Sequence, residues 1–291
     1  MSAPRDPEEL EVAAEPAGAE ISPLLSLGAV HLTVANLERS LAYYREAVGL
    51  DVLGQEDARA SLGTGGRELL VLVEEPGARP ARGYTGLYHF ALLVPERADL
   101  ARWLAHAARD RVPLVGLSDH FVSEALYLSD PDGHGIEIYW DRPREGWEGK
   151  VGQRLTTEPL DTDSLLAELE DPAAATFDGL PDGTVMGHVH LKVSSIPETI
   201  AFYRDRLGFG LMAQLGEQAA FLSAGGYHHH LGANTWESAG APSPPPGAAA
   251  LRRATIVLPD EDERDRVLGR AGVDGPEIVD PSGNALLVDA R

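Results

Sequence analysis

One stretch of this chain is repeated further along it. Residues 29–50, AVHLTVANLERSLAYYREAVGL, align without a gap with residues 188–209, HVHLKVSSIPETIAFYRDRLGF, with 8 identities in 22 positions. In each copy an alternating apolar run typical of a strand is followed by a polar cap and a helical spacing of apolar residues, and Gly49 or Gly208 then stops the helix. The repeat predicts the same strand and helix twice, and internal repetition constrains a fold more than any single motif.

A second repeat follows the first. Residues 89–104 resemble residues 253–268, and DPDGHGIEIYW (130–140) resembles DPSGNALLVDA (280–290). Short strands punctuated by glycine are expected after each helix, as in residues 68–75, 125–130 and 219–226. The chain is therefore expected to contain four βαβββ modules, which we number one to four in chain order, and its fold class is α+β.

The modules suggest how the chain is divided. We expect a disordered acidic tail over residues 1–22, a first domain of two modules over 23–140 and a second over 185–291. Residues 141–184 read as a linker with a short helix near Thr162 to Leu169, capped by Asp161 or Thr162.

Composition excludes several functions. Asp and Glu outnumber Lys and Arg by 46 to 24, for a formal charge of −22, which argues against a nucleic-acid partner. No apolar run is long enough to span a membrane, and the N-terminus has no signal-peptide pattern, so a cytoplasmic protein is expected. Without cysteine, any metal site must use His, Asp and Glu.

The segment DPDGHGIEIYW raises a question about charge. Side chains alternate across a strand, so Ile136 and Ile138 face one way while Glu137 and Tyr139 face the other. A buried carboxylate costs several kcal/mol unless something pairs with it. Glu137 is therefore either on an edge strand in contact with water or neutralised inside the fold.

The four modules, the opening of modules one and three and the DPDG…E ending resemble the vicinal oxygen chelate superfamily of glyoxalases, bleomycin resistance proteins and extradiol dioxygenases. The likeness covers nearly all of residues 27–291 and is greatest to two-domain proteins of the catechol 2,3-dioxygenase type. It implies that modules pair into two cupped, barrel-like mixed sheets, with a metal in the cup. Superfamily membership alone does not settle the chemistry.

A longer motif is more discriminating. The segment from His120 through Tyr127 and Asp130-Pro131-x-Gly133 to Glu137 resembles the signature of extradiol ring-cleaving dioxygenases, with Ser118 as its one departure. The resemblance implies that Glu137 is a metal ligand and that Tyr127 donates a hydrogen bond to a substrate hydroxyl. His120 would lie either behind the metal ligands or beside the bound substrate.

The ligand positions are filled unevenly among the modules. Modules two and three carry His89, Glu137 and His188 at the positions that the superfamily uses. The matching positions in modules one and four hold Ala29, Arg253 and Leu287. We therefore expect modules two and three to form the active cup, and modules one and four a metal-free one. Two imidazoles and a carboxylate suit Fe(II), with Mn, Zn or Ni as the other candidates.

The triple histidine in GGYHHHLGANTW lies near the last strand of module three. By resemblance to the extradiol enzymes, His229 would be the catalytic acid–base, while His228 and His230 would share the opposite face of a regular strand. A fourth metal ligand among the three, or three simple polar residues, are the other interpretations. His190, His228, His230 and Tyr139 are candidates for substrate contact, although His190 could instead pack, as His31 would at the equivalent place.

The resemblance thus implies an extradiol dioxygenase that opens a catechol-type diol with Fe(II) and O₂ and yields a hydroxymuconic semialdehyde. Two alternatives are a glyoxalase-like metal-dependent isomerase or lyase and a metal-free protein that binds an aromatic drug. The expected partners are a small aromatic diol and O₂, with no nucleic acid and no membrane. The protein could be a monomer or a homodimer.

Overall fold

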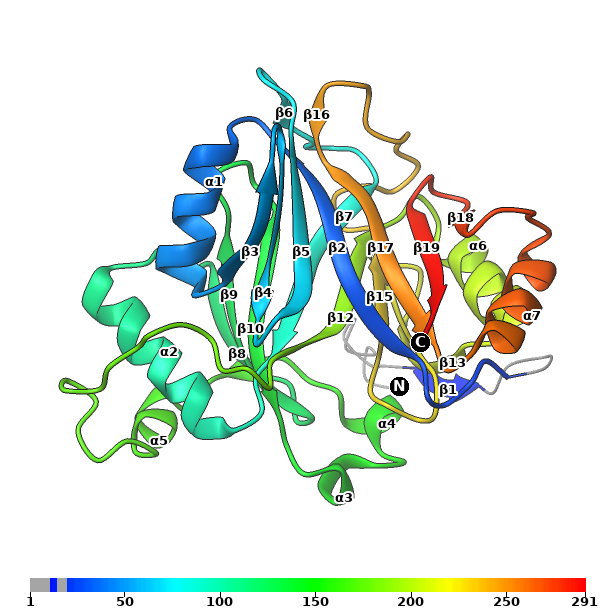
Figure 1. Ribbon diagram of the computed structural model, residues 1–291. Helices are drawn as coiled ribbons and strands as arrows, with labels where there is room; N and C mark the ends of the chain where they lie inside the picture. The colour runs from blue at the N-terminus through cyan, green and yellow to red at the C-terminus, as the bar shows by residue number, and fades with distance from the viewer. Residues whose placement is uncertain (1–10, 15–19) are drawn as a thin grey trace.

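A computed structural model describes residues 11–14 and 20–291 of the chain (Figure 1). The strands are β1 (Glu11–Ala14), β2 (Ser26–Val34), β3 (Asp51–Glu56), β4 (Arg59–Thr64), β5 (Arg67–Glu74), β6 (Arg79–Pro80), β7 (Gly86–Leu93), β8 (Gly116–Asp119), β9 (Ser123–Ser129), β10 (Gly135–Asp141), β11 (Glu158–Pro159), β12 (Val185–Lys192), β13 (Gly210–Leu215), β14 (Ala219–Ser223), β15 (Leu231–Asn234), β16 (Ala248–Ala249), β17 (Leu251–Leu258), β18 (Glu277–Val279) and β19 (Ala285–Ala290). The helices are α1 (Leu37–Tyr43), α2 (Arg97–Asp110), α3 (Arg144–Trp147), α4 (Val151–Arg154), α5 (Thr162–Leu166), α6 (Ile196–Ile200) and α7 (Glu261–Ala271), with π-helical turns η1 (Tyr44–Val48) and η2 (Ala201–Leu207).

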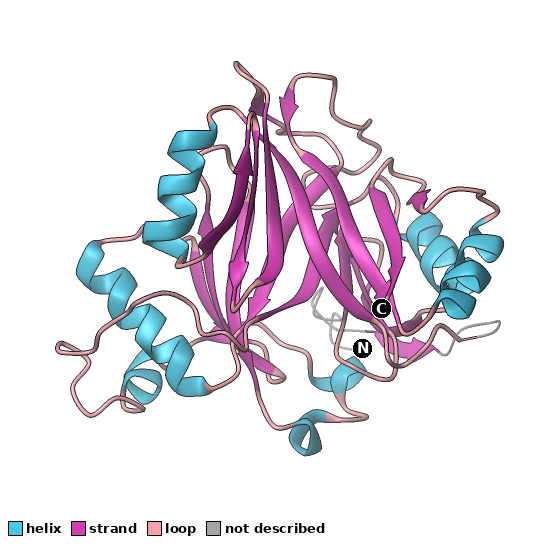
Figure 2. Ribbon diagram, in the orientation of Figure 1, coloured by secondary structure: helices cyan, strands magenta, loops and turns pink. Residues whose placement is uncertain are grey.

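Two large mixed sheets occupy the centre of the molecule, and helices flank them (Figure 2). The first sheet has the order β1-β13-β14-β15-β12-β7-β10-β9-β8-β11, and the second has the order β18-β19-β17-β2-β5-β4-β3. The first sheet joins modules two and three through the antiparallel pair β7 and β12, and the second joins modules one and four through β2 and β17. This topology confirms the predicted α+β class and the predicted pairing of modules.

The repeated helices begin and end alike. The side chains of Asn36 and Ser195 accept hydrogen bonds from backbone N–H groups three residues on, which caps α1 and α6. Each helix continues into a π-helical turn and stops at a glycine with positive φ, 92° at Gly49 and 94° at Gly208. The sequence pattern therefore predicted both ends of each helix.

Module four differs from the βαβββ pattern, because only β18 and β19 follow its helix. In module two, residues 111–134 separate α2 from the last strand and hold two further strands. In module four, the corresponding residues 272–284 are too few for a second strand and its turn. The second sheet is consequently shorter on that side.

The linker contains more helices and strands than the one helix expected from the sequence. It contains α5, capped by the Asp161 side chain as predicted, and also α3, α4 and the short strand β11, which pairs with β8. Of the tail expected to be disordered, residues 11–14 form β1 and pair with β13, while residues 1–10 and 15–19 lie outside the described residues. The division into sequence halves 23–140 and 185–291 stays a prediction, since each sheet draws on both.

The Asp-Pro turns before β10 and β19 have the same construction. The Asp130 carboxylate accepts hydrogen bonds from the backbone of residues 132 and 134 and from the Tyr44 hydroxyl. The Asp280 carboxylate does the same with residues 282 and 284 and with Tyr203. Because the turn occurs in both sheets, this part of the signature serves the fold.

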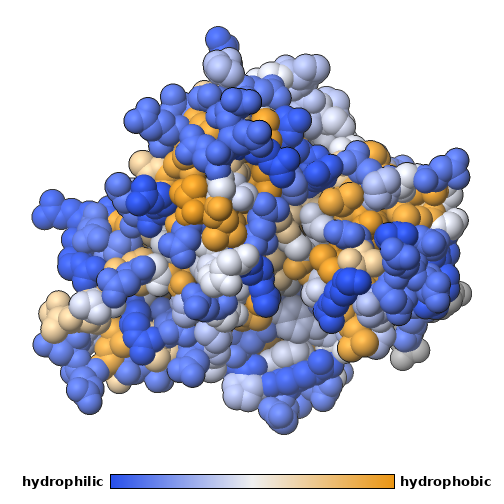
Figure 3. All heavy atoms as spheres, in the orientation of Figure 1, coloured by the Kyte–Doolittle hydropathy of each residue, from blue (hydrophilic) through white to orange (hydrophobic). Residues whose placement is uncertain are grey.

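Polar residues cover most of the face seen in Figure 3, with smaller apolar patches between them, as expected for a chain of net charge −22. Among the described helices, none is both long enough and apolar enough to cross a membrane.

Candidate metal centre

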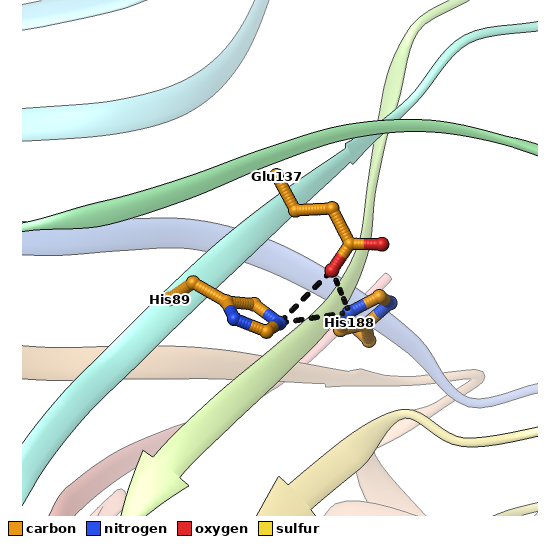
Figure 4. Close-up of side chains that lie close together, drawn as sticks. All are labelled: His89, Glu137 and His188. Atoms are coloured by element: carbon orange, nitrogen blue, oxygen red, sulfur yellow. Dashed lines mark hydrogen bonds and ion pairs between the residues drawn. The ribbon is translucent and has the colours of Figure 1, made fainter. Parts of the chain in front are cut away.

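Three predicted ligands meet in the first sheet. His89 lies on β7, Glu137 on β10 and His188 on β12, and their side chains converge from these neighbouring strands (Figure 4). Nε2 of His89 and Nε2 of His188 are each 3.0 Å from Oε2 of Glu137, and the two nitrogens are 3.2 Å apart. The three atoms thus form a nearly equilateral triangle.

Strand register explains this convergence. Ala91 on β7 pairs with Glu137 on one side and with His188 on the other. Residues 89 and 91 lie on the same face of β7, since side chains alternate. The small side chain of Ala91 leaves the space between the strands to the longer ligands. Neighbouring Gly187 is required for a different reason, because a Cβ there would lie 1.8 Å from the Tyr139 hydroxyl.

The site is almost closed to water. The exposed fractions are 6% for His89 and 2% for both Glu137 and His188. Burial opposes ionisation of Glu137, but the two adjacent imidazoles outweigh it and hold the pKa of that carboxyl well below its usual range. Burial lowers the pKa of His188, so its imidazole is neutral at neutral pH and has a lone pair to give a metal.

The donor atoms fit a metal ion. On a metal with bonds of about 2.1 Å, two ligand atoms at right angles are about 3.0 Å apart. The observed separations of 3.0, 3.0 and 3.2 Å are those expected of three donor atoms that would share one ion. In the described part of the chain, this is the one cluster of His, Cys, Asp or Glu whose donor atoms lie close enough to share an ion. The cup of modules one and four has no such cluster among its described residues.

Tyr127 and His120 form a pair beside the ligands. The Tyr127 hydroxyl is 2.7 Å from Nε2 of His120, and Nδ1 of His120 is 2.8 Å from the Thr156 carbonyl. A carbonyl can only accept, so Nδ1 carries a proton and Nε2 of a neutral ring accepts from Tyr127. Burial, with the Glu137 carboxylate close by, raises the pKa of Tyr127 well above its usual value. Tyr127 therefore keeps its proton, for which Nε2 of His120 and the Glu137 carboxylate are both acceptors.

The triple histidine does not form the regular strand that the sequence suggested. Residues 228–230 make a bend before β15, so the three rings do not alternate between two faces. Two glycines with positive φ, Gly225 and Gly226, start this bend and break the strand pattern. Each ring consequently has its own surroundings.

His229 is the histidine of the three that packs closest to the ligands. Its ring centroid lies 4.2 Å from that of His188. Burial lowers the pKa of His229 well below its usual value, so the ring is neutral and can accept a proton. His228 is fully buried between Asp141 and His229, whereas Nδ1 of His230 is 3.1 Å from the Ser223 hydroxyl. Nothing in these contacts directs His230 to the ligands.

The other two candidates for substrate contact border the site. The ring of Tyr139 lies 4.9 Å from His188, with its hydroxyl 2.8 Å from that of Tyr227. The ring of His190 lies 5.0 Å from His89, and its buried Nε2 has no partner among the described residues. Both side chains are thus walls of the site, and Nε2 of His190 remains available to a bound molecule.

Several neighbours were missed from the sequence. Asp141 and Tyr227 bond to each other and to residues of the site, and the half-exposed Trp236 packs with Tyr88 against His190. The alternation of β10 could have indicated Asp141, which shares a face with Glu137 and Tyr139. No local pattern marks the others, because they come from loops and neighbouring strands.

The chain is similar to known proteins over most of its length. The model of the Glyoxalase/Bleomycin resistance protein/Dioxygenase superfamily matches residues 26–138 and 185–286. A catechol-2,3-dioxygenase of Bacillus subtilis (strain 168) is 43% identical over 269 residues, which are 90% of this chain and 93% of that protein.

Two solved structures share the fold at low identity. A protein of Bacillus subtilis subsp. subtilis str. 168 has a TM-score of 0.62 at 14% identity, covering 94% of this chain and 86% of that one. Glyoxalase I of Zea mays has a TM-score of 0.51 at 16% identity, covering 91% and 92%. Together with the modular sheets and the buried ligand triangle, the matches establish that the chain belongs to the glyoxalase/bleomycin resistance protein/dioxygenase superfamily.

Proposed function

We propose that this protein is an extradiol ring-cleaving dioxygenase that acts on a catechol-type aromatic diol with Fe(II) and O₂. The observation that carries the proposal is the buried triangle of His89, His188 and Glu137, with Tyr127 and His229 beside it. The 43% identity to a catechol-2,3-dioxygenase over nearly the whole chain supports the same reaction.

The ligand triangle supports a metal ion with open positions. His89, His188 and Glu137 would hold the ion through two nitrogens and one oxygen, a set that suits non-haem Fe(II). When bound, iron would bring the diol and dioxygen together and let electrons pass from the diol to dioxygen, while the protein supplies binding, orientation and proton handling. Mn, Zn and Ni are the other metals that such a set accepts, so identity of the metal is part of the test.

His229 is the proposed proton acceptor. Its neutral ring lies against His188, where a diol held at the open positions would present a hydroxyl. Taking that proton as the diol binds, and returning it when the ring opens, is a task for an imidazole. The exclusion of water around these buried side chains strengthens each polar interaction with the substrate.

Tyr127 is the proposed donor to a substrate oxygen. It has one proton, for which His120 and the Glu137 carboxylate are the acceptors beside it. A substrate oxygen that gains negative charge is a better acceptor than a neutral imidazole. Tyr127 would then turn its hydrogen bond from His120 to the substrate as the reaction proceeds. Tyr139 and His190 would border the aromatic ring.

The two alternative functions have less support. A glyoxalase-like isomerase would want a second carboxylate, and none joins the cluster among the described residues. A metal-free drug-binding protein would not need two imidazoles and a carboxylate whose donor atoms lie within 3.2 Å of one another in a buried site. All three ligands come from one chain, so we propose that a monomer is competent; a homodimer would leave the site unchanged.

The test is oxygen consumption by protein loaded anaerobically with Fe(II) and then given catechol and substituted catechols. We expect equal uptake of O₂ and formation of a yellow ring-fission product, with Mn, Zn and Ni proteins assayed beside it. Stoichiometric bound iron without any uptake would contradict the dioxygenase and favour the isomerase. Failure to bind any metal would favour the drug-binding protein.

A further inference from the structure

A continuous chain of hydrogen bonds runs from Asp141 to His229. Oδ1 of Asp141 is 2.8 Å from Nε2 of His228, and Nδ1 of His228 is 2.9 Å from Nδ1 of His229. Asp141 is the last residue of β10, the strand that carries Glu137. These two hydrogen bonds thus connect the end of a ligand-bearing strand to the proposed proton acceptor, His229.

The other oxygen of Asp141 is also engaged. The Tyr227 hydroxyl donates to Oδ2 at 2.7 Å, and the Tyr139 hydroxyl is 2.8 Å from that of Tyr227. Since the Tyr227 hydroxyl donates its one hydrogen bond to Asp141, the Tyr139 hydroxyl must donate to the oxygen of Tyr227. Partners on both oxygens fix the plane of the carboxylate and aim Oδ1 at His228.

The direction of each hydrogen bond follows from Asp141. A carboxylate only accepts, so Nε2 of His228 carries a proton. In a neutral ring, Nδ1 of His228 then has the lone pair and accepts from Nδ1–H of His229. Nε2 of His229 is left without a proton, and within the described part of the chain no hydrogen bond reaches it. This is the tautomer that can accept a proton from a substrate.

The opposite direction is costly. It requires His228 to be protonated on both nitrogens, which would bury a cation with the Asp141 carboxylate, at 2.8 Å, as its counter-charge. Trp147, from the linker, covers that ring edge-on at 5.6 Å and is itself 2% exposed. Trp147 thus limits the access of water to the His228 ring, while the Asp141 side chain is 18% exposed.

We propose that Asp141 is a positioning residue that, through His228, holds His229 in the tautomer with its proton on Nδ1 and its lone pair on Nε2. The consequence for catalysis rests on the proposed function. His228 then belongs to the support of His229 and does not contact the substrate. The linker has a part in the site because its Trp147 packs against the His228 ring.

Imidazole tautomers can be read directly by NMR. Long-range ¹H–¹⁵N correlation of the full-length protein, labelled at histidine and loaded with diamagnetic Zn(II), separates Nδ1–H from Nε2–H rings. The signals of His228 and His229 are assigned with the single variants His228→Gln and His229→Gln. We expect Nε2–H for His228 and Nδ1–H for His229 in the unaltered protein.

Asp141→Leu removes the acceptor with a side chain of similar size. We expect the Nδ1–H preference of His229 to weaken and kcat of the iron-loaded protein to fall by about 10- to 100-fold, as for other residues that orient a working side chain. KM should change by less than about 3-fold, because the metal and its ligands remain. Asp289→Leu, an exposed aspartate near the end of the last strand of module four, is the matched control and should keep both properties.

The outcomes separate the two proposals. Nε2–H at His229 in the unaltered protein, or a doubly protonated His228, overturns the inference without any variant. So does an Asp141→Leu protein that keeps both the tautomer and kcat. If the unaltered protein has the expected tautomers but cleaves no catechol, the inference on Asp141 stands and the dioxygenase proposal fails.

Discussion

The strands β12, β7 and β10 of the first sheet correspond to β2, β17 and β19 of the second. The register is the same, since His190 pairs with His89 in one sheet and His31 with Arg253 in the other. The residues at the three ligand positions are His188, His89 and Glu137 in the first sheet and Ala29, Arg253 and Leu287 in the second. The same backbone arrangement is thus built twice, but among the described residues only the first sheet brings metal-binding side chains together.

This difference separates what the fold needs from what the function needs. Features found in both sheets, such as the glycine helix stops and the Asp130 and Asp280 turns, serve the fold. Features found in one sheet, such as the ligand triangle and the chain from Asp141 to His229, are candidates for function. Exchanging residues between equivalent positions of the two sheets tests which features serve the fold and which serve the function.

The largest effect is expected from Glu137→Leu, which copies Leu287 into the first sheet. Loss of the one carboxylate ligand should abolish metal retention and lower O₂ uptake by more than about 1,000-fold, since the iron supplies the chemistry. Metal content and oxygen consumption measure this, and Leu287→Met is the matched control, with activity within about 2-fold of the unaltered protein. A metal-loaded Glu137→Leu protein with full turnover would contradict the ligand assignment.

The same variant should lose stability when metal-free. Both imidazoles lie 3.0 Å from Oε2 of Glu137, and removing one partner of a buried charged cluster typically costs about 3–5 kcal/mol. Urea unfolding of the two metal-free proteins tests this. An unchanged stability would mean that the metal-free first sheet accepts leucine at this position as readily as the second sheet does.

Asp130→Ala and Asp280→Ala should have matching effects on stability. Each carboxylate holds two backbone N–H groups and a buried tyrosine hydroxyl, so each loss should cost about 2–3 kcal/mol. Equal shifts in urea unfolding would support a shared structural role. A loss of turnover per folded molecule in Asp130→Ala alone would instead give that turn a part in catalysis.

The smallest effect concerns pH and His31. Burial, followed by the nearby Arg253, lowers the pKa of His31 from 6.5 to about 4. The unfolded chain therefore binds a proton that the folded one does not, so stability is complete above pH 6.5 and is lost as pH falls toward 4. At pH 5 the loss is at most about 2 kcal/mol.

His31→Gln should remove this part of the pH dependence. The measurement is the difference in urea unfolding between pH 7.5 and pH 5 for the two proteins. An unchanged difference would show that His31 is not buried in its neutral form.

Repetition in the sequence was sufficient for much of the fold. The alignment of residues 29–50 with 188–209 predicted the capped helices, and the uneven distribution of His89, Glu137 and His188 predicted which modules pair. Both inferences work because strand periodicity and ligand type are local properties that a single chain reveals.

Other features depend on contacts between distant segments. The bend at residues 228–230 overrides the expected strand, and Asp141 gains its meaning only when β10 lies beside that bend. Trp147 lies in the linker, and its contact with His228 is visible only once α3 is placed beside that ring. Contacts between distant segments decide such cases, and the local sequence pattern does not reveal those contacts.

The most direct test of this account is a crystal structure of the iron-loaded protein, with an anomalous difference map at the iron edge. We predict one strong peak per chain, bonded to Nε2 of His89, Nε2 of His188 and an oxygen of Glu137, with the second sheet empty. A peak in the second sheet, or one that His89 or His188 does not reach, would contradict the claim that a duplicated fold carries its metal in one sheet alone.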